Sequence, residues 1–235
     1  MTQPLDTRAR LVDAAERLFA ERGIDSVSLR EVTRASGARN AIALQYHFTD
    51  RAGVVAAILD KHAPEVEARR NALLDDYESG GLRDLRALAA ALVRPLAAQL
   101  ANPDGGPAFL QIYADLINRP TPDFGSTLDD PNASITRWRH LVDPLLAPDA
   151  TRLHRRFTAI LHAAIELGRR ARSGPHTDDR LFTSYLIDVV AAILGAPVSP
   201  DTRRLADERD AATVGRISTG GSGEAGRAPK RGGGT

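Results

Sequence analysis

The sequence predicts an all-α protein, and three observations support that fold class. Apolar residues recur at helical spacing along most of the chain, whereas no convincing alternation of apolar and polar residues indicates a strand. Hydrophobic residues make up 43% of the 235 residues but aromatic residues only 5%, which favours an interior of alanine, leucine and valine between packed helices. Glycine and proline residues separate the helical segments from one another.

The first helix is expected over residues 7–22, because four apolar residues there fall on one face. These residues are Leu11, Ala15, Leu18 and Phe19. Gly23 follows in the position of a left-handed C-terminal cap. The first helix should therefore end at Arg22.

A second, short helix has a complete start signal. Ser28 and Glu31 have the spacing of a capping box, in which each side chain bonds to the backbone of the other residue. Val27 and Val32 flank the cap as a hydrophobic staple. We expect this helix to stop at Gly37.

Helical segments continue through most of the remaining chain. A third helix fits residues 40–47, and a fourth fits residues 51–62 before a boundary at Pro64. Six further segments cover residues 65–78, 82–101, 107–118, 133–146, 151–173 and 178–195. Pro95 lies inside its segment and predicts a kink or break. Residues 198–235 are charged, then rich in Gly and Ser, so we expect a disordered tail that cannot offset its ordering entropy.

Composition and motifs argue against several classes of function. The chain has no cysteine, which removes disulfides, thiolate metal sites and a cysteine nucleophile. It contains no phosphate-binding loop, dinucleotide fingerprint, nucleophile elbow or zinc-protease motif, and its six histidines form no pair at i, i+4. We therefore expect no enzyme, no metal site and no cofactor. With neither a signal-like start nor a long apolar stretch, we expect a cytoplasmic protein that does not enter a membrane.

The most specific pattern lies in the first fifty residues. Three short helices, a glycine turn between the second and third, and a polar and aromatic cluster at the end of the third form a helix-turn-helix layout. In that layout the exposed face of the third helix reaches base edges in a DNA major groove. The formal net charge of +1 gives no global attraction to nucleic acid, so binding needs a local patch. Arg30, Arg34, Arg39 and Arg51 supply one.

Four blocks of sequence carry a resemblance to a known family. They are AAxxLFAERG at Ala14–Gly23, SLREV at Ser28–Val32, ASG at Ala35–Gly37 and YHFxxR at Tyr46–Arg51. Together, residues 11–59 resemble the DNA-binding domain of TetR-family (tetracycline-repressor-like) transcriptional regulators. The resemblance covers about a fifth of the chain, and the remainder is similar only in its helical character and length.

The resemblance implies a set of residues that contact DNA. They are Ser28, Arg39, Asn40, Ala41, Ala43, Gln45, Tyr46, His47 and Arg51. Those on the exposed face of the third helix would read bases, since Asn and Gln bond to adenine and an alanine methyl touches the thymine methyl. The others match positions that contact the DNA backbone.

Several of these residues have a second interpretation within the domain. Ser28 can be a cap alone, Tyr46 can pack against the first helix, and His47 can bond inside the domain. Arg39 can reach either phosphate or guanine. The segment between Gly37 and Phe48 is one residue longer than the commonest family pattern, so the register of base contacts in residues 38–45 stays open.

The last two long helices are apolar on two sides, so each must pack on two sides. The resemblance implies that one side meets a second subunit in a homodimer. The expected interface residues are Leu161, Ile165, Phe182, Leu186, Val190 and Ile193. An effector pocket would lie among the middle helices, although ordinary core packing also explains its candidates. These are Phe109, Tyr113, Trp138, Leu141, Phe157, Leu161 and His162.

The sequence thus predicts a helix-turn-helix DNA-binding domain at residues 1–50 and a helical effector-binding and dimerisation domain at residues 51–197. Residues 51–62 connect them. We expect a ligand-responsive repressor that binds a palindromic double-stranded DNA operator as a homodimer, with a small-molecule effector. Three alternatives remain: a regulator controlled by a protein partner, an activator, or a helical scaffold without an effector.

Overall fold

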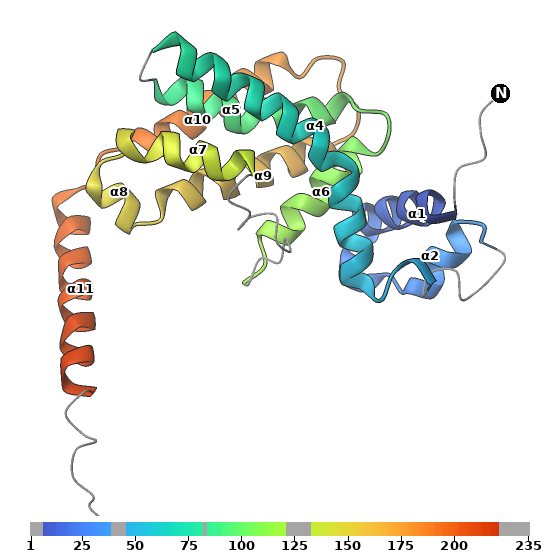
Figure 1. The fold of residues 1–235 in the computed structure, drawn as a ribbon, viewed down its shortest axis with the longest axis horizontal. Helices are drawn as coiled ribbons and strands as arrows, with labels where there is room; N and C mark the ends of the chain where they lie inside the picture. The colour runs from blue at the N-terminus through green and yellow to red at the C-terminus, as the bar shows by residue number, and fades with distance from the viewer. Residues whose placement is uncertain (1–6, 39–45, 82–83, 121–132, 221–235) are drawn as a thin grey trace, which may run out of the picture. The chain divides into compact units, whose positions relative to one another are not determined.

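The computed structural model describes residues 7–38, 46–81, 84–120 and 133–220 (Figure 1). These residues form α-helices, short 3₁₀ turns and loops, which confirms the predicted all-α class. The chain divides into two compact units, residues 1–195 and residues 196–235.

The chain enters the first unit through α1 (Thr7–Arg22), the 3₁₀ turn η1 (Ile24–Ser26) and α2 (Leu29–Ala35). The bounds of α1 agree with the prediction, and its four predicted core residues are buried. Gly23 has a φ of 84° and a ψ of 147°, a conformation for which glycine is suited but which is not the left-handed helical cap we predicted. Gly23 instead turns the chain into η1. We call α1, η1, α2 and the following residues to Phe48 the head.

Helix α4 (Arg51–Gly80) is continuous through Pro64, so the predicted boundary there is wrong. A proline inside a helix removes one hydrogen bond, to the carbonyl four residues earlier, which here belongs to Asp60. Both Asp60 and Pro64 are exposed, so water can satisfy that carbonyl and the helix continues. Asp50 caps the helix start by accepting from the Gly53 N–H at 2.9 Å.

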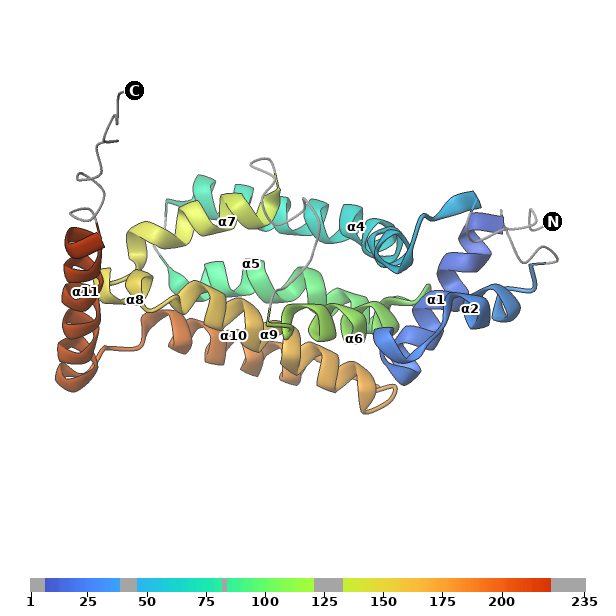
Figure 2. The same cartoon turned by 90° about the horizontal axis from the view of Figure 1, so that it is seen from below.

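Helix α5 (Leu85–Ala97) is the central helix of the first unit, packed between α4 and α10 and also against α7 and α9 (Figure 2). Every residue from Leu88 to Val93 is buried, as expected for a helix that is covered on all sides. Pro95 does not break α5. The chain changes to the 3₁₀ turn η2 (Ala98–Ala101) only after Ala97.

The remaining helices surround this central one. They are α6 (Gly106–Ile117), α7 (Ser134–Val142), α8 (Pro148–Arg152), α9 (Arg155–Arg172) and α10 (Arg180–Gly195). A 3₁₀ turn, η4 (Asp143–Leu145), follows α7. The segment predicted as one helix over residues 151–173 is divided at His154, whose φ of 54° interrupts the helical path. We call the first unit from α4 to α10 the body.

Helices α6 and α9 approach each other most closely at Gly168. A Cβ atom at Gly168 would lie 2.5 Å from the Cβ of Ala114 and 3.1 Å from the carbonyl oxygen of Leu110. Only a glycine therefore lets the two backbones come this near.

The second unit contains α11 (Pro200–Gly220), so the prediction of a disordered tail is wrong for residues 200–220. Local interactions explain the helix. Ser199 Oγ accepts from the Thr202 N–H at 3.2 Å, and Arg204 bonds to both Asp201 and Glu208 at 2.6 Å. These bonds stabilise a helix without burying apolar surface. Residues 221–235 lie outside the described residues.

Within the described residues, no single helix is both long enough and apolar enough to cross a membrane. Helix α10 and the beginning of α11 reach the required length and hydropathy only when they are counted as one segment, although a break separates them.

We predict that Gly168→Ala destabilises the protein, because the added methyl group collides with Ala114 and with the backbone of α6. The expected loss is about 1–3 kcal/mol in the free energy of unfolding, measured by urea denaturation. Gly80→Ala is the matched control, since a Cβ there meets nothing within 4 Å. Equal stability of the two variants would show that the α6–α9 crossing can relax around a methyl group.

Candidate DNA-binding head and its junction with the body

The start of α2 is fixed by the predicted capping box. The Glu31 N–H donates to Ser28 Oγ at 3.3 Å, and the Ser28 N–H donates to Glu31 Oε2 at 2.8 Å. Arg22 at the end of α1 donates to Glu31 Oε1 at 2.6 Å. Hydrogen bonds from Arg22 and Ser28 lower the pKa of Glu31 to about 2. The cap therefore also joins α1 to α2.

Arg51 holds the connection between α1 and α2. Its Nη1 donates to the carbonyl of Ile24 and its Nη2 to the carbonyl of Val27, each at 3.0 Å. Nη1 also lies 3.4 Å from Asp25 Oδ1, while Asp25 Oδ2 accepts from Arg119 beyond the end of α6 at 2.9 Å. Both terminal nitrogens of Arg51 thus have partners inside the chain. The phosphate contact of Arg51 stays a prediction.

The structure describes some of the predicted DNA-contacting residues and not the others. Ser28 is exposed, Tyr46 is 85% exposed and His47 is half-buried. Tyr46 therefore does not pack against α1, and its ring lies against His47 at 5.1 Å in an edge-on arrangement. The remaining predicted residues of the third helix lie outside the described residues. They are Arg39, Asn40, Ala41, Ala43 and Gln45.

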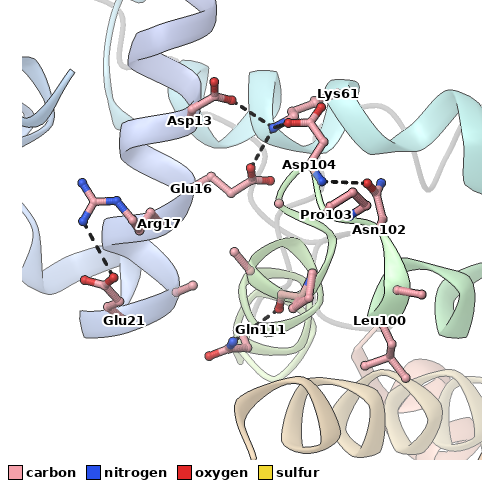
Figure 3. Close-up of a pocket in the computed structure, with 15 residues that line it drawn as sticks. Asp13, Glu16, Arg17, Glu21, Lys61, Leu100, Asn102, Pro103, Asp104 and Gln111 are labelled. Atoms are coloured by element: carbon pink, nitrogen blue, oxygen red, sulfur yellow. Dashed lines mark hydrogen bonds and ion pairs between the residues drawn. The ribbon is translucent and has the colours of Figure 1, made fainter. Parts of the chain in front are cut away.

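A buried group of charges joins the head to the body. Glu16 of α1 is 2% exposed, and its Oε1 lies 2.6 Å from His62 Nε2 of α4. Lys61 Nζ contacts Glu16 at 2.9 Å, Asp13 at 2.9 Å and Asp104 at 3.0 Å (Figure 3). Burial alone would lower the pKa of Lys61, but the hydrogen bonds to these three carboxylates outweigh it and raise that pKa.

His62 belongs to a buried network of hydrogen bonds. Asp104 N–H donates to Asn102 Oδ1, Asn102 Nδ2 donates to Gln99 Oε1, and Gln99 Nε2 donates to Glu65, each at 2.9 Å. Gln99 Oε1 is therefore an acceptor, and it lies 3.0 Å from His62 Nδ1. Nε2 faces the Glu16 carboxylate, so both ring nitrogens of His62 have buried polar partners. The ring is stacked on Phe109 at 4.6 Å.

An open cleft of about 620 Å³ lies beside this junction, between α1 and the turn before α6 (Figure 3). Four acidic side chains are among its lining residues, and Lys61 is already bonded to three of them. A Cβ atom at Gly105 would collide with the Glu16 carboxylate. Gly105, with a φ of 84°, is therefore needed where the turn passes Glu16.

A second cavity, of about 70 Å³, lies within the body. Phe109 and Tyr113, both predicted effector-pocket residues, line it. The other predicted pocket residues do not. They are Trp138, Leu141, Phe157, Leu161 and His162. Trp138 is fully buried and its indole N–H donates to the Leu88 carbonyl at 2.7 Å, so it is a core residue, whereas Phe157 is 45% exposed.

The face of α10 that we predicted for dimerisation points the other way. Leu186 and Val190 are buried within one chain, and Phe182 and Ile193 are partly buried against the same core. The opposite face exposes Leu181 and Tyr185. Both faces are apolar, and packing on α5 and α9 decides which one is internal. Leu161 of α9 is also partly buried against the core, and Ile165 is half-buried.

The sequence prediction missed Glu16, Lys61, His62, Gln99 and Arg70. A signal for three of them was present. Glu16 falls between Val12 and Phe19 on the buried face of α1, and His62 and Arg70 fall at four-residue spacing within the apolar stripe of α4. A polar residue inside an apolar stripe predicts a buried bond to another element.

Three features of the head are those of a helix-turn-helix domain. They are its capped second helix, the Gly37 turn with a φ of 69° and the aromatic cluster before α4.

Comparison with known proteins agrees. Residues 11–58 match the model of the family described as "Bacterial regulatory proteins, tetR family". Over 55 residues the chain is 36% identical to the HTH-type transcriptional regulator TtgR of Pseudomonas putida. It is also 36% identical to the probable HTH-type transcriptional regulator ArpR of Pseudomonas putida.

Residues 11–58 are thus similar to the helix-turn-helix segment of TetR-family transcriptional regulators. Each match covers 23% of this chain and 26% of the relative. The likeness therefore lies in the head and the start of α4.

We predict that Glu16→Gln strongly destabilises the protein, because it removes the carboxylate that Lys61 and His62 share. Removing one partner of a buried ion pair costs about 3–5 kcal/mol in the free energy of unfolding. Glu21→Gln is the matched control on the same helix, since Glu21 is exposed and pairs only at 3.8 Å with Arg17. A loss for Glu16→Gln no larger than for this control would contradict a charged junction.

Proposed function

We propose that this chain is a sequence-specific DNA-binding regulator of transcription that acts as a repressor. In this proposal a homodimer binds a pseudo-palindromic operator through its two heads. A small molecule bound in the body favours an arrangement of the heads that no longer fits the operator. The observation that carries the proposal is the helix-turn-helix head, whose capped second helix lies within the segment that matches the family.

Features of the head support a DNA contact. Ser28, Arg30 and Arg34 are exposed on or before α2, and Tyr46 is exposed a few residues before α4. Cationic side chains that neutralise phosphates make binding dependent on salt. Base reading falls to the third helix, which the resemblance assigns to residues 40–47.

Exposed apolar residues of α9 and α10 support a homodimer. Leu181 is 83% exposed, Tyr185 67% and Phe157 45%, although large apolar side chains usually avoid water. The two helices pack side by side (Figure 2), so a second copy could cover both. A two-fold dimer places two heads on two half-sites of a palindrome.

The junction supports control of the head by the body. Glu16 and Asp25 belong to the head, while their partners Lys61, His62 and Arg119 belong to the body. A ligand that shifts α4 or α6 therefore acts on α1 and η1. It changes the operator affinity only if it binds one arrangement more tightly than the other. The cavity in the body favours a small ligand over a protein partner as the controlling molecule.

Selection of bound duplexes from a random pool tests the proposal. We expect one enriched sequence with two inverted half-sites, bound with an affinity that falls steeply as salt rises. A non-selected duplex of equal length is the control. Equal affinity for the selected and the control duplex at low salt would refute the proposed function.

We predict that Leu181→Glu weakens the dimer at least about tenfold, because a carboxylate would be buried in the apolar interface. Sedimentation equilibrium measures the dimer dissociation constant. Leu205→Glu is the matched control, since Leu205 is an exposed leucine of α11 in the second unit. A dimer unaffected by Leu181→Glu would place the interface elsewhere.

A further inference from the structure

Arg70 is a charged residue on the buried face of α4. It is 4% exposed, and arginine is rarely buried to this extent unless its donors are paired. Burial lowers the pKa of Arg70 below its ordinary value, and the nearby Glu67 carboxylate opposes that shift. The guanidinium remains charged, since an arginine in a protein does not lose its proton.

The partners of Arg70 leave part of its guanidinium unused. Nη1 donates to Ser134 Oγ at 2.9 Å and to Glu67 Oε1 at 3.3 Å. Glu67 Oε2 is occupied by the Ser134 N–H at 2.6 Å. Among the described residues, no acceptor lies within reach of the buried Nε of Arg70. A buried donor without a partner is costly, so it marks a place for an acceptor that is not part of the chain.

Arg70 also lines the 70 Å³ cavity of the body. The other lining residues are mostly apolar, with Val66, Leu96, Phe109 and Ile135 among them. Glu67 and the exposed Asp60 add two carboxylates to the lining. A cavity of about 70 Å³ suits a polar head group with a short apolar part.

We propose that this cavity binds the carboxylate of a small monocarboxylic acid with an apolar body, held by the guanidinium of Arg70. The inference rests on the proposed ligand-responsive function and names the chemical class of its ligand. The planar guanidinium presents two parallel donors that match a carboxylate. The apolar walls accept the remainder of the acid.

The charges around the cavity argue against a more highly charged ligand. Asp60 and Glu67 repel a second negative charge, so a phosphate dianion is disfavoured relative to a carboxylate. A neutral amide of the same shape retains the apolar contacts but loses the charge-assisted bonds to Arg70. The site should therefore bind an acid more tightly than the corresponding amide.

Binding of propionate and butyrate, each compared with its own amide, tests the proposal on the full-length protein by calorimetry. We expect each acid to bind roughly 10- to 100-fold more tightly than its amide, as charge-assisted bonds imply. Arg70→Met should abolish that preference. Arg69→Met is the matched control, because Arg69 is the exposed neighbour on the same helix, and it should retain the preference.

Glu67→Gln provides a second test that does not remove Arg70. It removes a negative charge that competes for the guanidinium, so we expect the acids to bind severalfold more tightly and the amides to be unaffected. The proposal is overturned if the wild-type protein binds acids no better than amides, or binds none of these probes at millimolar concentration. It is also overturned if folded Arg70→Met keeps the preference.

Operator binding, measured separately, distinguishes a failure of the proposed ligand class from a failure of the proposed function. Selective DNA binding together with equal affinity for acid and amide would refute the ligand class alone. Conversely, an Arg70-dependent preference for acids that leaves operator affinity unchanged would refute ligand-responsive repression and retain the site.

Discussion

Six residues at four-residue intervals, from Val54 to Leu74, form the buried face of α4, and two of them are the ionisable residues His62 and Arg70. Charge on a buried face is tolerated only where other elements supply partners. The partners of His62 come from α1 and η2, and those of Arg70 come from α4 itself and the start of α7. The placement of the head and of α7 against α4 therefore depends on these partners of His62 and Arg70.

The continuity of α4 gives this arrangement a functional consequence. His62 and Arg70 are eight residues apart on one helix, a rise of about 12 Å, and Arg51 at its start holds η1 through backbone carbonyls. A continuous helix transmits a displacement at Arg70 to His62 more directly than two helices separated by a break would. Pro64 lies between His62 and Arg70 in the sequence but on the exposed side of the helix, so it does not interrupt the buried face.

The sequence predicted the head better than the body, for a physical reason. Caps and stripes in α1 and α2 depend on neighbours within a few residues, so Ser28, Glu31 and the core of α1 could be identified directly. The α4 partners of Glu16 and the α7 partner of Arg70 lie 45 or more positions away, and no local pattern identifies them. The break expected at Pro64 also divided the stripe of α4 and hid its regular spacing. For α10, two apolar faces are equivalent in the sequence, and only α5 and α9 distinguish them.

The two α4 cations Lys61 and Arg70 differ in whether all their hydrogen-bond donors have acceptors within the chain. Lys61 is one of only two lysines, and its compact ammonium has three donors, which three carboxylates approach at 2.9–3.0 Å. That cation is saturated and has no capacity for a ligand. Arg70 instead has a rigid fork with more donors than its two acceptors can satisfy. A saturated charge stabilises the junction between head and body, whereas an unsaturated one beside a cavity selects what enters it.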